Sequence, residues 1–435
     1  MGSAKHVVAL QNHRDINVLF VLIDTLRASR LASYGSSRET SPNIDYMAST
    51  GVRFARQLAQ SSWTKCSMAS LWTGRNPART GVLRAEHALP LEAVLPAELL
   101  RDAGFRTAGI WRNGWVDSNF GFSQGFEVYE RPRAGRVPAT LHRKNPNISL
   151  DGTDADVVSA ALDFLRVYGR DRWFLYIHMM DVHQYAYSLD SAIFGGDYLD
   201  IYDNSIHHTD NVLGRLLNHL AETELLKKTL VVIASDHAEA FMERGFEGHA
   251  TQVYPESTEV PLVIAFPFLL DPGVAIESRT RNVDIWPTIL DLLGLPELPD
   301  TDGRSLVPEI LAAVRDEEMP VERPPAIAHL DRNWGQPEGS PPLDAVALEE
   351  GGFRMVRRHQ GRDGSVVIEE LFDRESDPDE TLNVIGEHPE EAERLRGLVD
   401  AYLDPPVSPW GVEVPSVEID EMELNQLRAL GYAIP

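Results

Sequence analysis

Four mostly apolar runs divide the first two thirds of the chain, at residues 17–23, 173–177, 229–234 and 260–264. Runs of this length, rich in β-branched and aromatic residues, are typical of strands that are buried on both faces. Amphipathic helical patterns stand between them, at residues 95–103, 157–165 and 202–217. Strands that alternate with helices predict an α/β fold with a large mixed, mostly parallel sheet sandwiched by helices.

The pattern changes after residue 320. Short strand candidates at 326–330, 345–348, 353–357 and 365–372 have no long helix between them, which predicts a small antiparallel sheet, and an acidic helix follows at 389–403. A Glu- and Pro-rich segment at 316–325 is typical of a linker. We therefore expect a large domain at 15–320, a small α+β domain at 321–403 and a packing tail at 404–435 ending in a helix at 418–430. An aperiodic stretch at 133–151 predicts a surface insertion.

One short helix, predicted within residues 61–75, carries a candidate nucleophile. Ser61 and Ser62 can cap its start, and Gly74 can take the left-handed turn that ends it. Thr64 then lies in the first turn, where free backbone N–H groups and the helix dipole favour an anion. A hydroxyl beside an anion pocket suits acyl, phosphoryl or sulfuryl transfer, although a threonine that merely begins a helix is the plainer explanation.

Acids and histidines follow three of the predicted strands. Ligands in open α/β sheets bind at the carboxyl ends of strands, where a metal can be held. Each residue also has a plainer explanation, since Asp24 could cap a helix and buried histidines are common in cores. The residues at these three ends are Asp24; His178, Asp181 and His183; and Asp236 and His237, with His249 beyond. Together they predict a metal site. Asn113 follows a fourth strand, where substrate contact and loop packing are both open.

Composition narrows the classes of partner. A net charge of −26 argues against nucleic acid and anionic membranes, because both bind basic surfaces. The longest apolar runs are too short to span a bilayer, and a single cysteine excludes an internal disulfide. The first fifteen residues lack the apolar core of a secretory signal. We expect a soluble, cytoplasmic protein, or a periplasmic or secreted one if a leader has been removed; an oligomer stays open.

Several blocks, in order, resemble the sulfatase family of the alkaline phosphatase superfamily, from residue 17 to about 385. They are the strand ending in Asp24 with Pro42-Asn43-Ile44-Asp45, then Thr64 to Arg75, His178 to His183, Ser235-Asp236-His237 with Gly248-His249, Val283 to Thr288, and Leu371-Phe372-Asp373 to Asp377-Pro378. The resemblance implies a sulfatase-like catalytic domain, a small C-terminal antiparallel domain, a divalent metal and a small anionic ester as substrate.

The resemblance also assigns a nucleophile. The family's nucleophile lies eleven residues before the Arg of Leu-x-Thr-Gly-Arg, and counting back from Arg75 gives Thr64. Most sulfatases have a cysteine there, converted to formylglycine within Cys-x-Pro-x-Arg. Here the segment is Thr64-Lys65-Cys66-Ser67-Met68, without the Pro and Arg, so a threonine nucleophile is expected. By the same resemblance Asp24, Asp236 and His237 bind a metal that also contacts Thr64.

The remaining polar residues receive roles around the substrate. His183 matches a substrate-contacting histidine of the family and His249 stands where those enzymes have a lysine, so both could bind or protonate the leaving group. Alternatively Asp181, His183 and His249 could form a second metal site. Lys65, His178 and Asn113 are expected to bind the substrate. The nitrogen ligand that His237 supplies favours zinc or manganese over calcium.

The reaction that we expect is metal-dependent hydrolysis of phosphate monoesters, diesters or phosphonates by a threonine nucleophile. Three alternatives accompany it: hydrolysis of sulfuric esters, transfer of phosphoethanolamine or phosphoglycerol, and a non-catalytic binding protein that keeps the fold. Retained metal ligands argue against the last of these. No motif identifies the leaving group, the oligomeric state or the identity of the metal.

Overall fold

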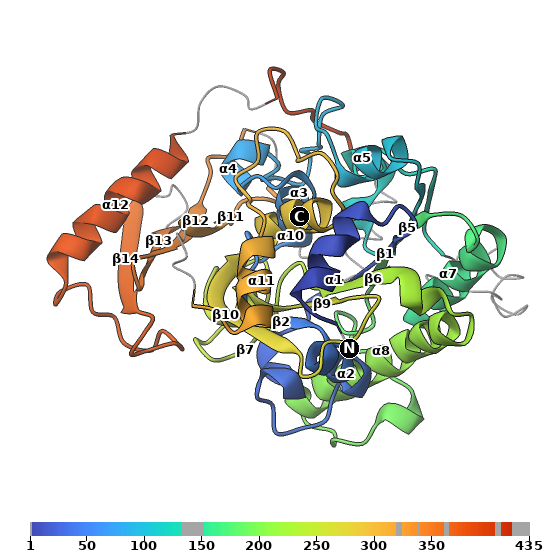
Figure 1. Cartoon of the computed structure of the whole chain (residues 1–435). Helices are drawn as coiled ribbons and strands as arrows, with labels where there is room; N and C mark the ends of the chain where they lie inside the picture. Colours follow the sequence, from blue (N-terminus) through green and yellow to red (C-terminus); the bar gives the residue numbers. More distant parts are fainter. Residues whose placement is uncertain are drawn as a thin grey trace, which may run out of the picture.

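The computed structural model describes residues 2–132, 152–318, 324–336, 339–360, 365–404 and 410–419. Its centre is an eight-stranded sheet (Figure 1). In spatial order the strands are β10 (Val274–Arg281), β2 (Val52–Leu58), β9 (Glu259–Ala265), β6 (Thr229–Ala234), β1 (Asn17–Ile23), β5 (Trp173–Met179), β3 (Arg106–Ile110) and β4 (Val128–Glu130). The predicted α/β class is confirmed.

The sheet is mostly parallel, with one strand reversed. β1 pairs in parallel with β5 and β6, whereas β9 runs antiparallel to both β2 and β6. The register sets Val21 beside Ile177 on one side and Ile233 on the other. The three strands therefore end at one edge, and the residues that follow them lie side by side.

Helices cover both faces of the sheet. Successive side chains of β1 point to opposite faces, so Val21 and Phe20 belong to different cores. The core with Val21 includes side chains of α2 (Pro42–Thr50), α7 (Asp154–Tyr168) and α8 (Tyr198–Glu222). The core with Phe20 includes those of α3 (Thr64–Thr73), α5 (Pro96–Asp102), α10 (Ile285–Leu292), α11 (Val307–Arg315) and α1 (Ala4–Ala9). Phe20 stacks on Trp286 of α10 at 5.2 Å, and Trp286 on Trp72 of α3 at the same distance.

A second, four-stranded antiparallel sheet follows the large one, as the pattern after residue 320 predicts. Its strands are β11 (Ala326–Asp331), β12 (Asp344–Glu350), β13 (Phe353–Gln360) and β14 (Val366–Asp373), paired in chain order. Helix α12 (Pro389–Leu403) packs on β12 and β13, burying Leu395 and Val399 against Leu348 and Met355 (Figure 1).

The two sheets meet through charged side chains, all buried except the half-buried Glu259, which we call the junction cluster: Arg354, Arg374, Glu259, Glu349 and Glu380. Arg354 lies 2.6 Å from Glu380 and donates to the carbonyl of Val253 at 2.6 Å. Arg374 lies 3.1 Å from the same Glu380 and also pairs with Glu259 at the start of β9. Each arginine thus joins the small sheet to the large domain.

Some predictions missed elements or lie outside the described residues. Strands β2 and β10 are absent from the prediction because β2 carries charged Arg53 and Arg56 and β10 interrupts its apolar residues with Glu277 and Arg279. The insertion at 133–151, part of the linker at 316–325 and most of the helix at 418–430 are outside the described residues. The described tail, 410–419, touches the large domain, with the Val417 amide donating to the carbonyl of Glu86 at 2.8 Å.

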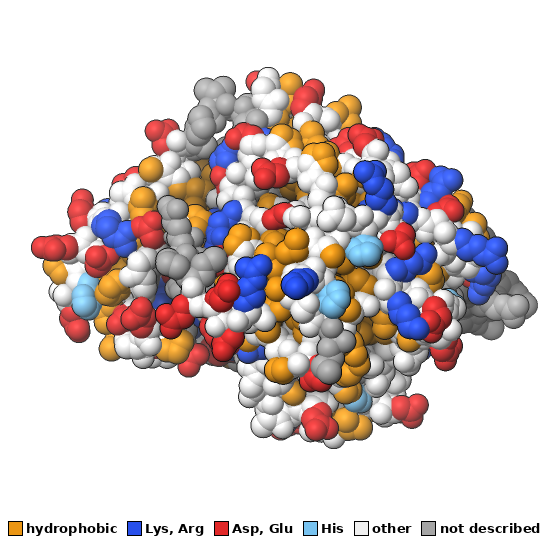
Figure 2. Space-filling view, in the orientation of Figure 1, with side chains coloured by type: hydrophobic (Ala, Val, Ile, Leu, Met, Phe, Trp, Pro, Cys, Tyr) orange, Lys and Arg blue, Asp and Glu red, His pale blue; other side chains and the backbone are white. Residues whose placement is uncertain are grey.

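The remaining α-helices and strands of the described residues are short. They are α4 (Pro77–Thr80), α9 (Pro255–Thr258) and a hairpin of β7 (Ala240–Phe241) and β8 (Glu247–Gly248). On the face drawn in Figure 2, acidic and basic side chains alternate over the surface. No helix of the described chain is both long enough and apolar enough to cross a membrane.

Candidate active site

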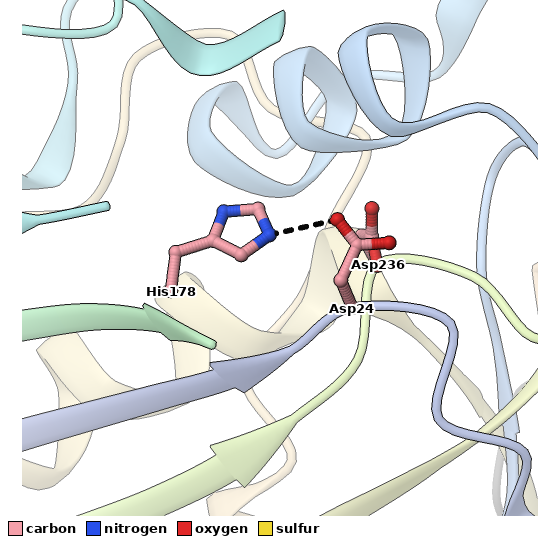
Figure 3. Close-up of side chains that lie close together, drawn as sticks. All are labelled: Asp24, His178 and Asp236. Atoms are coloured by element: carbon pink, nitrogen blue, oxygen red, sulfur yellow. Dashed lines mark hydrogen bonds and ion pairs between the residues drawn. The ribbon is translucent and has the colours of Figure 1, made fainter. Parts of the chain in front are cut away.

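Three buried side chains converge where β1, β5 and β6 end. Asp24 directly follows β1, His178 is the last but one residue of β5, and Asp236 stands two residues after β6. One ligand atom from each lies within 4.8 Å of the others, and all three side chains are buried. Figure 3 shows His178 pointing at the two carboxylates. The fold therefore brings together, at the predicted strand ends, residues more than 200 positions apart in the chain.

Thr64 begins α3 beside these groups, and its Oγ1 lies 3.1 Å from Nε2 of His237. The expected serine caps are wrong: Trp63 occupies the N-cap position without a side-chain bond, and the Ser62 hydroxyl donates to the carbonyl of Gln252 instead. Gly74 does end the helix in the left-handed region, at φ 66°. All ten residues of α3 are buried, so Thr64 is held by packing on every side.

Asn113 ties Thr64 to the first carboxylate. Its Nδ2 donates to Oδ2 of Asp24 at 2.7 Å and to Oγ1 of Thr64 at 3.1 Å. Its Oδ1 accepts the backbone N–H of Trp115 at 2.9 Å, which fixes the orientation of the amide. The sequence suggested substrate contact or loop packing, whereas the structure places this side chain directly on Thr64.

His237 presents a neutral nitrogen to the same place. Its Nδ1 donates to the carbonyl of Ala238 at 3.1 Å, leaving Nε2 as the acceptor that faces Thr64 and, at 3.3 Å, Asp236. Burial, with further help from the neighbouring His249, lowers the pKa of His237 to about 3. The imidazole therefore keeps the lone pair that a metal ligand needs.

His178, expected to bind substrate, instead contacts a carboxylate. Its Nε2 lies 3.0 Å from Oδ2 of Asp24, and its Nδ1 lies 2.8 Å from the hydroxyl of Tyr176. Burial raises the pKa of Tyr176 well above its usual value, so that hydroxyl keeps its proton and donates to Nδ1. The tautomer that satisfies both contacts has its proton on Nε2 and donates to Asp24. His178 thus orients Asp24, and its Nε2 lies in the same compact group as the two carboxylates.

The two carboxylates of the site differ in how their neighbours stabilise the ionised form. Burial and the charge of Asp24 raise the pKa of Asp236 well above its usual value. Burial also acts to raise the pKa of Asp24, but three histidines outweigh it and leave that pKa lowered. Oδ1 of Asp24 and both oxygens of Asp236 accept no hydrogen bond from the residues that the structure describes. Such orphaned, buried carboxylate oxygens beside neutral imidazoles fit a divalent cation.

Two further histidines stand next to this centre. The ring of His249 stacks on that of His237 at 4.5 Å, and the ring of His183 lies 4.9 Å from His249. Burial lowers the pKa of His183. Burial acts the same way on His249, but the Glu239 carboxylate, 3.2 Å from its Nδ1, outweighs it and raises that pKa. Glu239 was not identified from the sequence; its place two residues after His237 was the available signal.

Two predicted site residues are engaged elsewhere. Asp181 does not join His183 and His249 in a metal-ligand group among the described residues, because its carboxylate is bound by Arg112 at 2.6 Å. The ammonium of Lys65 donates to the carbonyl of Ala85 and lies 3.2 Å from the centre of the Phe120 ring. The second-metal hypothesis therefore loses its carboxylate, and Lys65 serves packing in this arrangement.

A cavity of about 560 Å³ lies away from Thr64, between the loop after β1, the β7–β8 hairpin and the C-terminal domain. Its charged walls include Arg27, Arg244 and Glu256. Arg27 pairs with Glu243, and Arg244 lies 2.9 Å from Glu256. Because these cations are matched by neighbouring carboxylates, the cavity does not present an obvious anion site.

Comparison with known proteins agrees with this geometry. A family model described as Sulfatase matches residues 16–295. The chain is 24% identical to arylsulfatase K of Xenopus laevis, over 89% of this chain and 83% of that protein. The fold is similar to that of the phosphonate monoester hydrolase of Agrobacterium radiobacter (TM-score 0.68, 20% identity, covering 89% of this chain and 96% of that one). It is also similar to a protein solved with its substrate D-glucosamine-2-N,6-O-disulfate (TM-score 0.69, 18% identity, 92% and 100%).

Proposed function

The chain belongs to the sulfatase family, metal-dependent ester hydrolases of the alkaline phosphatase superfamily, and we propose that it hydrolyses phosphate esters or phosphonates with Thr64 as nucleophile. The observation that carries the proposal is the environment of one oxygen. Oγ1 of Thr64 contacts both His237 and Asn113, at 3.1 Å each, beside the buried carboxylates of Asp24 and Asp236. A hydroxyl so placed is a nucleophile that a bound cation can activate.

Phosphorus is favoured over sulfur because of the residue type. A hydrated formylglycine can release sulfate by elimination, but a threonine ester has no such exit and must be cleaved by water at its central atom. The one cysteine, Cys66, offers no substitute: it is buried, and its Sγ lies 3.8 Å from the carbonyl of His329. Burial raises the pKa of Cys66 to about 12, so the thiol stays protonated and unreactive.

The cation would be held by Asp24, Asp236 and His237, with His178 orienting Asp24. Two carboxylates and an imidazole favour zinc or manganese over calcium, which prefers oxygen ligands only. When bound, such a cation lowers the pKa of a hydroxyl and neutralises charge on phosphoryl oxygens.

The residues of the chain divide the remaining work. Thr64 releases its hydroxyl proton to solvent and Oγ1 attacks phosphorus; the bond to the leaving oxygen breaks while Asn113, donating to Oγ1, holds the nucleophile in place. His249, with Nδ1 held by Glu239, donates a proton from Nε2 to the leaving oxygen. The same nitrogen then takes a proton from water, whose oxygen attacks phosphorus; the bond to Oγ1 breaks, and Oγ1 recovers a proton from solvent to restore the threonine. His183 binds the substrate beside His249.

Sulfuric ester hydrolysis is the second candidate, because the similar arylsulfatase K is named for that activity. Transfer of a phosphoryl-linked headgroup would use the same first step, with an alcohol replacing water in the second. Hydrolysis of a phosphate ester and transfer of the headgroup differ only in the acceptor, which is water or an alcohol, so analysis of the products separates them.

The test combines metal content with turnover of matched nitrophenyl phosphate, phosphodiester, phosphonate and sulfate esters. Thr64→Ala should abolish turnover while Ser70→Ala, a buried substitution in the same helix, should preserve it. Zinc or manganese together with Thr64-dependent cleavage that favours phosphorus would support the proposal. Preferential, Thr64-dependent cleavage of the sulfate would overturn the choice of substrate. Unchanged turnover in Thr64→Ala would remove the nucleophile assignment.

A further inference from the structure

A buried ionic cluster beside the site takes no part in the chemistry proposed above. Nη1 of Arg112 lies 2.6 Å from Oδ1 of Asp154 and 2.6 Å from Oδ1 of Asp181, and both carboxylates are buried. Nη2 of the same guanidinium donates to Oε1 of Gln184 at 2.5 Å. We call Arg112, Asp154, Asp181, Gln184 and Thr209 the clamp cluster.

Asp154 fixes the backbone that follows β5. Its carboxylate accepts the N–H of Met180 at 2.7 Å and that of Asp181 at 3.0 Å. It also accepts the hydroxyl of Thr209, on α8, at 3.1 Å. The two bonded amides lie between His178 and His183 in the chain, so the start of α7 determines how this segment leaves the sheet.

Arg112 fixes a different loop, the one that follows β3. The next residue is Asn113, whose amide rests on Oγ1 of Thr64. The guanidinium therefore ties the loop that carries Asn113 to the segment that carries His183. Both loops leave the same edge of the sheet, and no backbone hydrogen bond between them is among those of the described residues.

The two carboxylates of the cluster are satisfied from within, although Nε of Arg112 has no partner among the described residues, and this distinguishes them from the carboxylates of a ligand site. Asp181 also accepts the Asp154 N–H at 3.2 Å, and Nε2 of His208 lies 3.6 Å from it. Both carboxylates share one guanidinium, so neither has the orphaned oxygens of Asp24 and Asp236. The cluster therefore fixes the positions of the loops after β3 and β5, and its carboxylates have no free oxygen with which to bind another cation.

We propose that Arg112 is a positioning residue that holds Asn113 against Thr64 during the reaction. The proposal rests on the proposed function in that Thr64 must be the nucleophile. Positioning matters because a misplacement of about 1 Å at the reacting atoms can lower the rate on the order of 100-fold. The loop after β3 has no other charged tether to the segment after β5 among the described residues.

The first test compares two substitutions within the cluster. Arg112→Lys keeps the charge but cannot bind Asp154, Asp181 and Gln184 together, and we expect kcat to fall between 10-fold and 100-fold with KM within about twofold. Thr209→Val removes one hydrogen bond to the same Asp154 and is the control within the cluster, with a smaller loss of melting temperature and kcat within about twofold. A loss of kcat that follows the loss of melting temperature in both variants would show a merely structural role and overturn the proposal.

A milder variant keeps the proposal testable if Arg112→Lys does not fold. Gln184→Met removes one acceptor of the guanidinium at the surface and leaves both ion pairs, so we expect an intermediate loss of kcat. A double-mutant cycle with Asn113→Ala then identifies the route. If Arg112 acts through Asn113, Arg112→Lys or Gln184→Met should lower kcat little further in the Asn113→Ala background. Additive losses would overturn the proposal.

A readout without turnover separates this proposal from the proposed function. Amide hydrogen exchange at residues 110–116 should rise in Arg112→Lys and stay near wild type in Thr209→Val. An unchanged exchange rate at 110–116 would overturn the positioning role even in an active enzyme. If the wild type cleaved no ester, the proposed function would fall, while the exchange experiment would still decide whether Arg112 holds the loop.

Discussion

Asp236 in the candidate active site and Glu380 in the junction cluster are buried alike but have different partners. Glu380 is 0% exposed and has two guanidinium groups within reach, Arg354 at 2.6 Å and Arg374 at 3.1 Å. Asp236 is also 0% exposed, and the nearest titratable nitrogen is that of His237 at 3.3 Å. Because the pKa of His237 is lowered to about 3, that nitrogen carries no charge at neutral pH.

The difference separates structural charges from functional ones. A buried charge is tolerated when the protein supplies its counter-charge, and a pair of this kind fixes the contact between two domains. Where the protein supplies no such counter-charge, as at Asp236, the ionised carboxylate is costly to bury. The same residue type therefore joins two sheets in one place and, in the other, belongs to a group that could hold a metal.

Removing the charge of a carboxylate in the candidate site should have the largest effect on activity. Asp236→Asn is expected to lower kcat/KM by about 10³-fold or more, because it removes a proposed metal ligand and its charge. In the presence of a chelator the same variant should melt at a higher temperature than wild type, since it no longer buries a carboxyl group whose ionisation beside Asp24 is unfavourable. Steady-state kinetics and thermal melts check both signs, and a lower melting temperature in chelator would contradict the interpretation.

The corresponding change in the junction cluster should lower the stability of the fold instead of raising it. Glu380→Gln leaves Arg354 without its partner and is expected to destabilise the fold by about 3–5 kcal/mol. Turnover per folded molecule should stay near wild type. Denaturant titration measures the loss, and Glu277→Gln, at an exposed ion pair 3.4 Å from Arg53, is the control with an expected change within about 0.5 kcal/mol.

Removing the metal should lower the stability of proteins that keep the candidate metal site, and so should separate the site carboxylates from those of the junction cluster. At a free metal concentration 100 times Kd, the wild type should gain about 2.7 kcal/mol over the chelated protein. The Glu380→Gln variant should gain the same amount, whereas Asp236→Asn should gain far less. Melting curves with zinc, with manganese and with chelator make the measurement; an equal gain in all three proteins would place the cation elsewhere.

The smallest expected effect is a pH dependence within the clamp cluster. Burial and the neighbouring Asp154 raise the pKa of Asp181 to about 6, against an ordinary value of 3.8. The folded state thus binds more protons than the unfolded state between about pH 4 and 6. Asp181 therefore contributes stability below about pH 4 that is lost as the pH rises through 6.

Asp181→Asn should flatten that part of the stability curve by about 1 kcal/mol per pH unit. Denaturant titrations from pH 4 to 7 test this, with Asp163→Asn, exposed and paired to Arg166, as the control expected to keep the wild-type slope. The same slope in wild type and Asp181→Asn would assign the titration to another group.

Apolar runs predicted the central elements well because burial on both faces leaves a strong local signal. The run at 17–23 is β1, and that at 229–234 is β6, both with the predicted bounds. The acidic helix at 389–403 is likewise α12. Edge strand β10 escaped prediction because a strand with half-exposed polar residues lacks that signal.

The sequence by itself determined the fold class, the family and the set of polar residues at the strand ends, because periodicity, residue type and spacing are all local properties. It also placed Thr64 at the start of its helix and marked Asp24, Asp236 and His237. Only the tertiary structure decided which neighbour each polar group meets. It pairs Asp181 with Arg112, brings His178 into contact with Asp24 and lets Asn113 donate a hydrogen bond to Thr64. These contacts join positions up to 154 residues apart, and their partners depend on strand order and register, which no local pattern encodes.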